Sequence, residues 1–362
     1  MHEKTPDFRF MATGIGSVPF LDIETTCREI CRQVPFMPFW PQFVQRSHLE
    51  DMIIQYSEGL PLLEVNAEER SLFCPLSDQK ETDLVRFYEQ FFAHDVERFA
   101  VSREYAPGLY AILELIDKGE ADPGPYIKGQ TVGPVTFTAG VKDLKGRSIL
   151  YDPELSEAMT KGLAIKALWQ VKKLASLGKK PVIFLDEPYL SGFGSAFSPV
   201  QRHEVVDMLR MVIDYLKENT DVLIGIHCCG NTDWSMIFET GVDIINFDAF
   251  EFMDHFLLYK DDIVRFVERG GTIAWGIIPT AGFTGDESVD SLFSRLKKGF
   301  MRVNQWGVDL DLLARRSILT PACGMGTMSV DHAEKAMELL SHLSERCREW
   351  DMDAVSDGGD IT

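Results

Sequence analysis

The sequence predicts an α/β fold, specifically a (β/α)8 TIM barrel, from two observations. Short apolar runs alternate with long helical patterns along the 362 residues, which is typical of a parallel sheet wrapped by helices. The chemically reactive side chains follow directly after these runs, and barrel enzymes carry their sites at the carboxyl ends of the strands. Eight strands are predicted, at 8–16, 36–41, 126–129, 182–185, 222–226, 244–247, 273–276 and 317–320. The second has the poorest strand pattern, because its prolines would interrupt the ladder.

The predicted helices begin at residues that commonly cap helices. The tetrapeptide SHLE at 47–50 is a capping box before a predicted helix in DMIIQYSEGL. Asp152 and Pro153 open a helix that runs to about Leu177, because proline suits the first helical position. The pair SP at 198–199 and the triplet SVD at 329–331 open two more. The stretch from about 47 to 125 is too long for one crossover, so we expect a helical insertion after the second strand.

No internal repeat and no low-complexity linker divides the chain. We therefore expect residues 1–350 to form a single barrel domain that contains the insertion. Residues 351–362 are polar, acidic and glycine-containing, which predicts a flexible tail.

Composition excludes several classes of partner. The net charge of −20 disfavours nucleic acid, whose phosphates need a basic footprint, and it disfavours anionic membranes. No apolar run is long enough to span a bilayer, and MHEKTPDFRF lacks the pattern of a signal peptide. Seven cysteines, an odd number, indicate free thiols or metal ligands in a reducing compartment. We expect a cytoplasmic protein.

A candidate metal site begins at the end of the fifth predicted strand. His227 and Cys229 are two residues apart, so on an extended chain they point the same way while Cys228 faces elsewhere. Cys323, after the eighth strand, and Asp248, at the end of the sixth, could complete the set. Thiolate, imidazole and carboxylate together favour zinc over hard cations. The alternative is that these cysteines pack as small hydrophobes, which is our expectation for Cys228 and for the other four: Cys27, Cys31, Cys74 and Cys347.

Three further stretches carry candidate binding groups. Asp186 and Glu187 end the fourth strand and could bind an amine or exchange protons, or could cap a helix. In KGQTVGPVTF, at 128–137, glycines and hydroxyls would let backbone amides approach a ligand. In TGIGSVPF, at 13–20, Ser17 and backbone N–H groups suit a carboxylate.

Taken together, these motifs resemble the catalytic barrel of cobalamin-independent methionine synthase, within the superfamily of uroporphyrinogen decarboxylase. The matching pieces are IGS at 15–17, VGPVT at 132–136, DEP at 186–188, His227-x-Cys229 and the turn at Cys323. They occur in the family's order and span nearly the whole chain.

The resemblance implies a zinc ion that binds homocysteine as its thiolate and presents it to a methyl donor. His227, Cys229 and Cys323 would ligate the zinc, and Asp248 aligns with a glutamate ligand. Asp186 would hold the substrate ammonium, with Glu187 beside it as a second catalytic acid. The turn of Ile15, Gly16 and Ser17 would hold the substrate carboxylate, and Gln42 stands where the family has an acidic substrate contact. The GPVT motif, with Gly133, Pro134 and Thr136, would bind the donor.

The sequence departs from the family mainly on the donor side. Gly140 replaces an aromatic residue that would stack on folate, and Ile278 replaces a histidine proposed as proton donor. The family's N-terminal half has no counterpart here. We therefore expect a thiol S-methyltransferase that converts homocysteine to methionine with either methyltetrahydrofolate or a methyl-corrinoid, perhaps on a corrinoid protein, as donor. The alternatives are a corrinoid-linked enzyme acting on another thiol, a uroporphyrinogen decarboxylase-like enzyme, and a non-catalytic zinc- or corrinoid-binding protein.

Overall fold

The computed structural model describes residues 6–75, 79–194 and 200–352, and it contains a curled, all-parallel sheet of seven strands. The order across the sheet is β1-β10-β9-β8-β7-β6-β4, so most neighbours in the sheet are also neighbours in the chain. This is the α/β architecture expected from alternating apolar runs and helices. The strands are β1 (Met11–Ala12), β4 (Tyr126–Val132), β6 (Lys180–Asp186), β7 (Leu223–Cys228), β8 (Ile244–Asp248), β9 (Thr272–Ile278) and β10 (Ser317–Pro321).

The second predicted strand, 36–41, is not a strand, and the sheet is not closed by a regular ladder there. Instead, Phe39 makes an isolated parallel bridge to Lys128 of β4, and Gln42 makes one to Ser17 after β1. Pro38 and Pro41 have no N–H to donate, so the segment cannot hydrogen-bond continuously to both edges. The gap between β1 and β4 is therefore spanned by an irregular segment.

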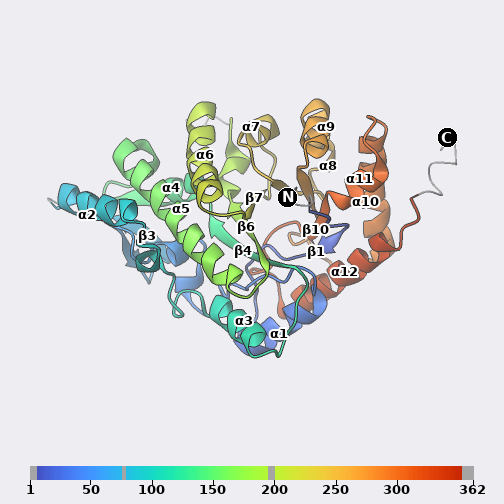
Figure 1. Cartoon of the computed structure of the whole chain (residues 1–362), viewed down its shortest axis with the longest axis horizontal. Coiled ribbons are helices and arrows are strands. Elements are labelled where there is room, and N and C mark those ends of the chain that lie inside the picture. Colours follow the sequence, from blue (N-terminus) through green and yellow to red (C-terminus); the bar gives the residue numbers. More distant parts are fainter. Residues whose placement is uncertain (1–5, 76–78, 195–199, 353–362) are drawn as a thin grey trace.

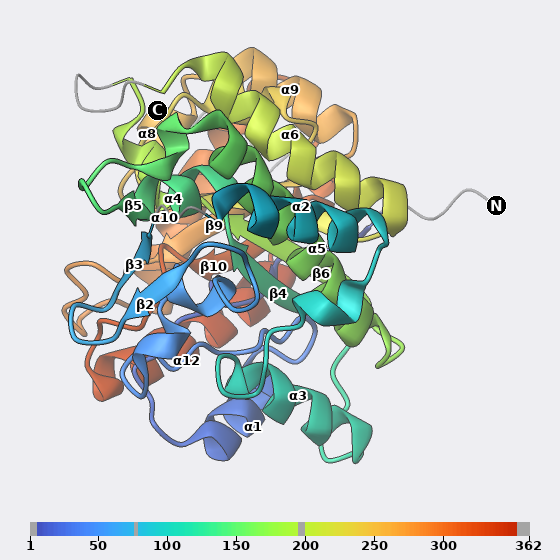
Figure 2. The ribbon, with the colours of Figure 1, turned by 90° about the vertical axis from the view of Figure 1, so that its left-hand side faces the viewer.

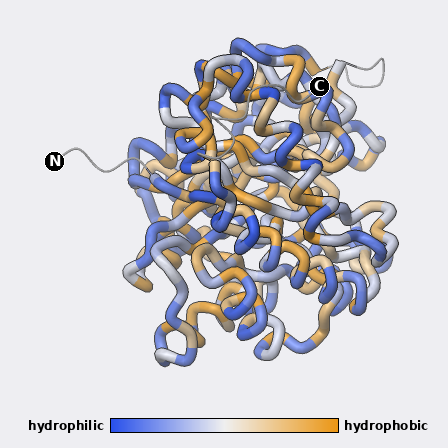
Figure 3. The backbone as a smooth tube through the Cα atoms, turned by 90° about the vertical axis from the view of Figure 1, so that its right-hand side faces the viewer, coloured by the Kyte–Doolittle hydropathy of each residue, from blue (hydrophilic) through white to orange (hydrophobic). Residues whose placement is uncertain are grey.

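The two faces of the sheet bury different side chains, as the two-residue period of a strand requires. Ile183, Ile226 and Trp275 point outward into the main apolar core against the helices. Alternate residues point inward and form a smaller apolar cluster at the amino ends of the strands: Phe8, Met37, Tyr126, Val182, Phe184, Ile244, Ala274 and Ile318. Figure 3 shows hydrophobic segments running through the middle of the molecule, with hydrophilic stretches at its periphery.

Helices follow the strands and surround the sheet (Figure 1). Two predicted starts are confirmed, because the Asp152 side chain accepts from Leu155 N–H and the Ser329 side chain accepts from His332 N–H. The predicted start at 198–199 lies outside the described residues. The helices are α1 (Ile23–Gln33), α4 (Pro134–Gly140), α5 (Pro153–Ala175), α6 (Arg202–Asn219), α7 (Trp234–Glu239), α8 (Met253–Phe256), α9 (Lys260–Glu268), α10 (Val289–Asn304), α11 (Leu310–Arg315) and α12 (Val330–Arg348).

The insertion predicted at 47–125 is only partly helical. After the capping box the chain forms two short 3₁₀ helices, η1 (His48–Glu50) and η2 (Ile54–Tyr56), instead of the predicted α-helix. The reason lies in Glu50, whose buried carboxylate accepts from Phe43 N–H at 2.8 Å rather than closing the box at Ser47. The rest of the insertion contains β2 (Glu64–Asn66), β3 (Ser71–Cys74), α2 (Lys80–Phe92), η3 (Val96–Phe99) and α3 (Pro107–Asp117).

Strands β2 and β3 form an antiparallel hairpin, and β3 also pairs with β5 (Lys142–Asp143) in a second, three-stranded sheet. Figure 2 shows this hairpin near β5. Two remaining 3₁₀ helices, η4 (Ile149–Tyr151) and η5 (Pro188–Gly192), follow β5 and β6. None of the helices in the described ranges has the length and apolar character that a membrane span requires.

Candidate metal centre and substrate cavity

Three of the four predicted metal ligands come together at the carboxyl ends of the strands. One ligand atom each from His227, Cys229 and Cys323 lies within 4.8 Å of the other two. His227 is in β7, Cys229 follows that strand directly, and Cys323 lies just after β10. Parallel strands end at the same edge of the sheet, so residues nearly 100 positions apart in sequence can meet there.

The His227 ring is fixed by a buried amide. Its Nδ1 lies 2.5 Å from Asn246 Oδ1. The amide nitrogen of Asn246 donates to Ala274 O at 2.9 Å and to Thr320 Oγ1 at 2.8 Å, which fixes the orientation of the amide. Because Asn246 thus offers an acceptor, the network assigns the ring proton to Nδ1 and leaves Nε2 free to ligate.

The thiols and the imidazole perturb one another strongly. Hydrogen bonds from Cys323 and from His227 lower the pKa of Cys229 well below its ordinary value. The same bond to Cys229, together with burial, raises the pKa of Cys323. Burial alone would lower the pKa of His227, yet its bond and charge interaction with Cys229 raise it overall. These interactions favour the thiolate form of Cys229. The thiolate is the form of cysteine that binds a soft metal.

The geometry fits one zinc ion with an open position. Zinc–sulfur bonds of about 2.3 Å and zinc–nitrogen bonds of about 2.0 Å in a tetrahedron imply ligand separations of roughly 3.3–3.8 Å. The observed separations of within 4.8 Å need only small side-chain adjustments to reach this. Three protein ligands are the pattern of catalytic zinc sites, which keep the fourth position for water or substrate.

Asp248, the fourth predicted ligand, is not part of this group. It ends β8, and its Oδ1 accepts from the N–H groups of Phe250 and Glu251 at 2.9 and 2.8 Å. Burial raises its pKa to about 6, and the nearby Cys229 contributes to that rise. In this structure Asp248 therefore caps the turn after β8, within electrostatic range of the cluster.

A cavity of about 470 Å³ opens beside the three ligands. Predicted substrate residues Ile15, Ser17, Gln42 and Asp186 also line it. The rest of the lining comes from the loop after β10, from the segment after Gln42, from the insertion and from η5: Val44, Gln45, Asp51, Met52, Arg70, Pro188, Gly324, Gly326 and Thr327.

Asp186 provides an unsatisfied acceptor in this cavity. Its side chain is 5% exposed, and its Oδ1 has no hydrogen-bond partner among the described residues. Burial raises its pKa to about 6, although the charges of Lys128 and His227 oppose that rise. A buried acceptor without a donor carries a desolvation cost that a bound cation would relieve.

Glu187 faces away from the cavity and binds the GPVT motif. Its carboxylate accepts from Val135 N–H at 2.9 Å, from Thr136 N–H at 2.8 Å and from the Thr136 hydroxyl at 2.6 Å. A Cβ on Gly133 would lie 2.3 Å from this carboxylate, which is why the motif has glycine there. Burial raises the pKa of Glu187 to about 7. Gly133, Pro134 and Thr136, predicted to bind the donor, thus form the amino end of α4 and hold Glu187.

The turn after β1 is packed against the loop of Cys323. Ser17 Oγ accepts from Gly326 N–H at 3.3 Å, and Ser17 O accepts from Met325 N–H at 2.9 Å. A Cβ on Gly16 would lie 2.4 Å from Gln42 Oε1, so glycine allows Gln42 to pack here. Gln42 donates to Gln55 Oε1 at 2.7 Å. Within the described residues, the structure records no acceptor for the N–H of Ser17, which stays free for a ligand.

Sequence reasoning missed three polar residues around the site. Asn246 and Lys128 are polar residues within otherwise mostly apolar strand segments. This break in the apolar pattern could have identified both as candidate site residues. Lys128 is fully buried, donates to Ile15 O and lies 3.1 Å from Gln130 Oε1. Burial lowers its pKa to about 7. Arg70 reaches the cavity from the hairpin turn, and no local signal indicates that contact.

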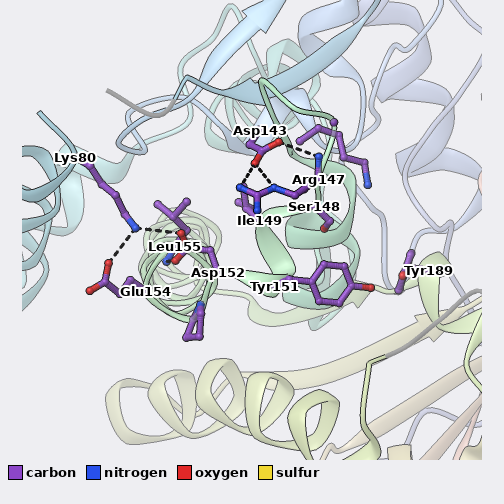
Figure 4. A pocket seen from close by; sticks show the side chains of 13 residues that line it. Lys80, Asp143, Arg147, Ser148, Ile149, Tyr151, Asp152, Glu154, Leu155 and Tyr189 are labelled. Carbon is purple, nitrogen blue, oxygen red and sulfur yellow. Dashed lines mark hydrogen bonds and ion pairs between the residues drawn. The ribbon is translucent and has the colours of Figure 1, made fainter. Parts of the chain in front are cut away.

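A second, larger cavity of about 790 Å³ lies on the other side of η5. Pro188 lines the first cavity and Tyr189 the second, so the two share a wall. Figure 4 shows Lys80 paired with Asp152 and Glu154, Arg147 paired with Asp143, and the Tyr151 ring extending toward Tyr189. The Tyr189 N–H donates to Thr136 Oγ1 at 3.2 Å, which ties this wall to the GPVT motif.

The chain has limited similarity to known proteins. No model of a known protein family matches the chain, and no curated protein matches it. Among solved structures, a B12-independent methionine synthase from Shewanella sp. W3-18-1, in complex with selenomethionine, is similar with a TM-score of 0.47 and 20% sequence identity. The similarity covers 67% of each chain. Values of this size assign neither a family nor an activity.

The buried cysteines outside the cluster agree with the expectation of core packing. Cys27, Cys74, Cys228 and Cys347 are fully buried, and Cys31 is 9% exposed. Cys228 packs into the apolar core outside the sheet, although it lies between two residues of the cluster.

Proposed function

We propose that this protein is a zinc-dependent thiol S-methyltransferase that methylates homocysteine to methionine. The observation that carries the proposal is the group of His227, Cys229 and Cys323 beside a substrate-sized cavity. Three ligands leave one position for an incoming sulfur. A zinc ion bound there would act as a Lewis acid that lowers the pKa of a thiol, which is near ~8.5 when free.

The chain's own residues would bind the other groups of the amino acid. Asp186 lines the same cavity with an acceptor oxygen that has no protein donor, and a substrate ammonium would supply that donor. An ammonium close to this carboxylate would also favour its ionised form. The free N–H of Ser17 is suited to the substrate carboxylate. Ammonium and carboxylate would thus hold the amino acid with its thiol toward the ligand cluster.

The methyl transfer balances without an oxidant or a reductant. A bond forms between the substrate sulfur and the methyl carbon as the bond between that carbon and the donor breaks. The electron pair of the broken bond leaves with the donor, and the thiol proton goes to solvent.

Two observations favour a methyl-corrinoid over methyltetrahydrofolate as donor. A folate nitrogen must gain a proton when it leaves, whereas cobalt keeps the electron pair without one. Ile278, at the end of β9, is fully buried and cannot supply that proton. The second cavity shares a wall with the metal cavity, and three cationic side chains in its lining are matched by three acidic ones. Its lining therefore has no surplus positive charge to attract the polyglutamate tail of a folate.

The test is methionine formation by the zinc-loaded protein with homocysteine and either methylcobalamin or methyltetrahydrofolate. We expect product with methylcobalamin, loss of product in Cys229→Ser, and retention in Cys228→Ser, whose thiol faces the core. Product with the folate alone would contradict the donor assignment. Zinc binding without product from either donor would favour a non-catalytic binding protein.

A decarboxylase acting on a porphyrinogen is not favoured by the cavity. Such a substrate carries many carboxylates and needs a basic lining. Among the described residues that line the cavity, Arg70 is the one with a permanent positive charge, and Asp51 and Asp186 are acidic.

A further inference from the structure

The β2–β3 hairpin contributes a charged residue to the mouth of the metal cavity. Its turn is organised by Asn66, whose Oδ1 accepts from the N–H groups of Glu68 and Glu69, each at 3.1 Å. The turn ends at Arg70, which has a φ of 48°, a left-handed conformation that is unfavourable for a residue with a side chain. Backbone strain of this kind is often found at ligand sites.

The guanidinium of Arg70 is held by hydrogen bonds from two of its three nitrogens. Nε donates to Asp51 Oδ2 at 2.7 Å, and Nη2 donates to Val44 O at 2.8 Å and also to Asp51 Oδ1. Within the described residues, no acceptor is recorded for Nη1, so its two N–H groups remain free. An arginine anchored along one edge presents its other edge in a fixed orientation.

Packing connects Arg70 to the turn that carries Ser17. Val44, whose carbonyl binds Arg70, and Ser17 both contact Gly326: a Cβ built on Gly326 would lie 2.5 Å from Val44 Cγ2 and 3.0 Å from Ser17 Cβ. All four residues line the metal cavity. Val44 and Gly326 therefore connect Arg70 to Ser17 within the lining of one cavity.

We propose that Arg70 is a specificity-determining residue that binds the carboxylate of the thiol substrate together with the turn at Ser17. The inference rests on the proposed function, and it narrows the substrate class to small thiols that carry a carboxylate. Arg70 supplies the positive charge, and Ser17 N–H supplies a directed hydrogen bond. Asp186 then remains for the ammonium group. Asp51 weakens the attraction for an anion, because its charge opposes that of Arg70.

The experiment measures thiol binding by calorimetry to the zinc-loaded protein, without a methyl donor. The probes are homocysteine, 3-mercaptopropionate with a carboxylate only, cysteamine with an ammonium only, and neutral 2-mercaptoethanol. Arg70→Gly is the main variant, because glycine accepts the backbone conformation at this position while the guanidinium is lost. The matched control is Arg147→Gly, which removes a second arginine paired with an aspartate, outside the metal cavity.

In Arg70→Gly we expect binding of homocysteine and 3-mercaptopropionate to weaken at least tenfold, with less than a twofold change for cysteamine and 2-mercaptoethanol. Asp51→Asn should strengthen binding of the two carboxylate probes. Equal weakening of all four probes in both variants would overturn the proposal, because it would show a purely structural ion pair. Unchanged binding of every probe in Arg70→Gly would also overturn it and leave the proposed function intact. No binding of any thiol by the unmodified protein would instead contradict the proposed function itself.

Discussion

At the scale of single residues, the candidate site depends on side chains that do not touch the substrate. Asn246 orients His227, and its own amide is fixed by Ala274 and Thr320. Residues that orient metal ligands in this way are commonly worth one to two orders of magnitude in affinity. Asn246 is therefore a positioning residue for the proposed zinc.

We predict that Asn246→Ala weakens zinc binding about 10- to 100-fold, because the His227 ring loses the acceptor that fixes its tautomer. Competition with a chromophoric chelator measures this directly. The control is Asn304→Ala, which removes an amide bonded to Val308 O at the end of α10, outside the lining of the metal cavity. Equal zinc affinity in Asn246→Ala and in the unmodified protein would show that Asn246 does not position His227 for zinc binding.

A second prediction concerns the pH dependence contributed by Glu187. Its folded pKa of about 7 lies above the ordinary value of 4.5, because burial disfavours the charged form. Between these values the folded state holds a proton that the unfolded state has lost, so this contribution to stability decreases as pH rises from 4.5 to 7. We expect the stability difference between the unmodified protein and Glu187→Gln to be larger at pH 5 than at pH 8, by about 1–3 kcal/mol.

Denaturant unfolding at the two pH values tests this, with Glu157→Gln as the control for an exposed carboxylate. Glu157 pairs with Lys161 on the surface of α5 and is 49% exposed. A difference that is the same at both pH values would show that Glu187 is ionised in the folded protein throughout the range.

At the scale of elements, the irregular segment between β1 and β4 needs side-chain hydrogen bonds in place of a ladder. Trp40 Nε1 donates to Gln170 Oε1 at 2.9 Å, and Gln170 Nε2 donates to Gln130 O at 2.9 Å. Gln130 Nε2 in turn donates to Trp40 O at 3.0 Å. Two buried glutamines thus join the segment to β4 and α5, where the prolines prevent regular pairing.

We predict that Gln170→Leu lowers the free energy of unfolding by about 2–3 kcal/mol, because the buried N–H of Trp40 loses its acceptor and the buried carbonyl of Gln130 loses one of its donors while keeping the Tyr56 hydroxyl. Urea unfolding measures the change. Gln305→Leu, at an exposed position after α10, is the control and should change stability by less than about 0.5 kcal/mol. A small effect of Gln170→Leu would mean that the segment is held by apolar packing alone.

At the scale of the whole molecule, the sequence predicts best where local pattern and tertiary structure agree. The runs that became β6, β7, β8, β9 and β10 are mostly apolar, and nearly all residues on both of their faces are buried, so their positions could be predicted. The meeting of Cys229 with Cys323 follows from the parallel arrangement of those strands.

The parts that could not be predicted depend on long-range partners. The capping box at 47–50 fails to start an α-helix because Glu50 binds Phe43, a contact that the local pattern does not reveal. The insertion was expected to be helical, yet β3 finds its partner in β5, about 70 residues later. Asp248 follows a strand as a ligand would, and its Oδ1 accepts from two backbone N–H groups of its own turn, an engagement that the local pattern does not reveal; its place among the zinc ligands stays a prediction.

We propose that His227, Cys229 and Cys323 hold one zinc ion, and the metal content of the purified protein tests this assignment. We predict about one zinc per chain in the purified, fully reduced protein, with zinc lost or weakened in both Cys229→Ser and Cys323→Ser. Cys228→Ser should keep its zinc, because that thiol packs outside the sheet. Protein that binds no zinc after reconstitution, or that loses it equally in Cys228→Ser, would contradict the account.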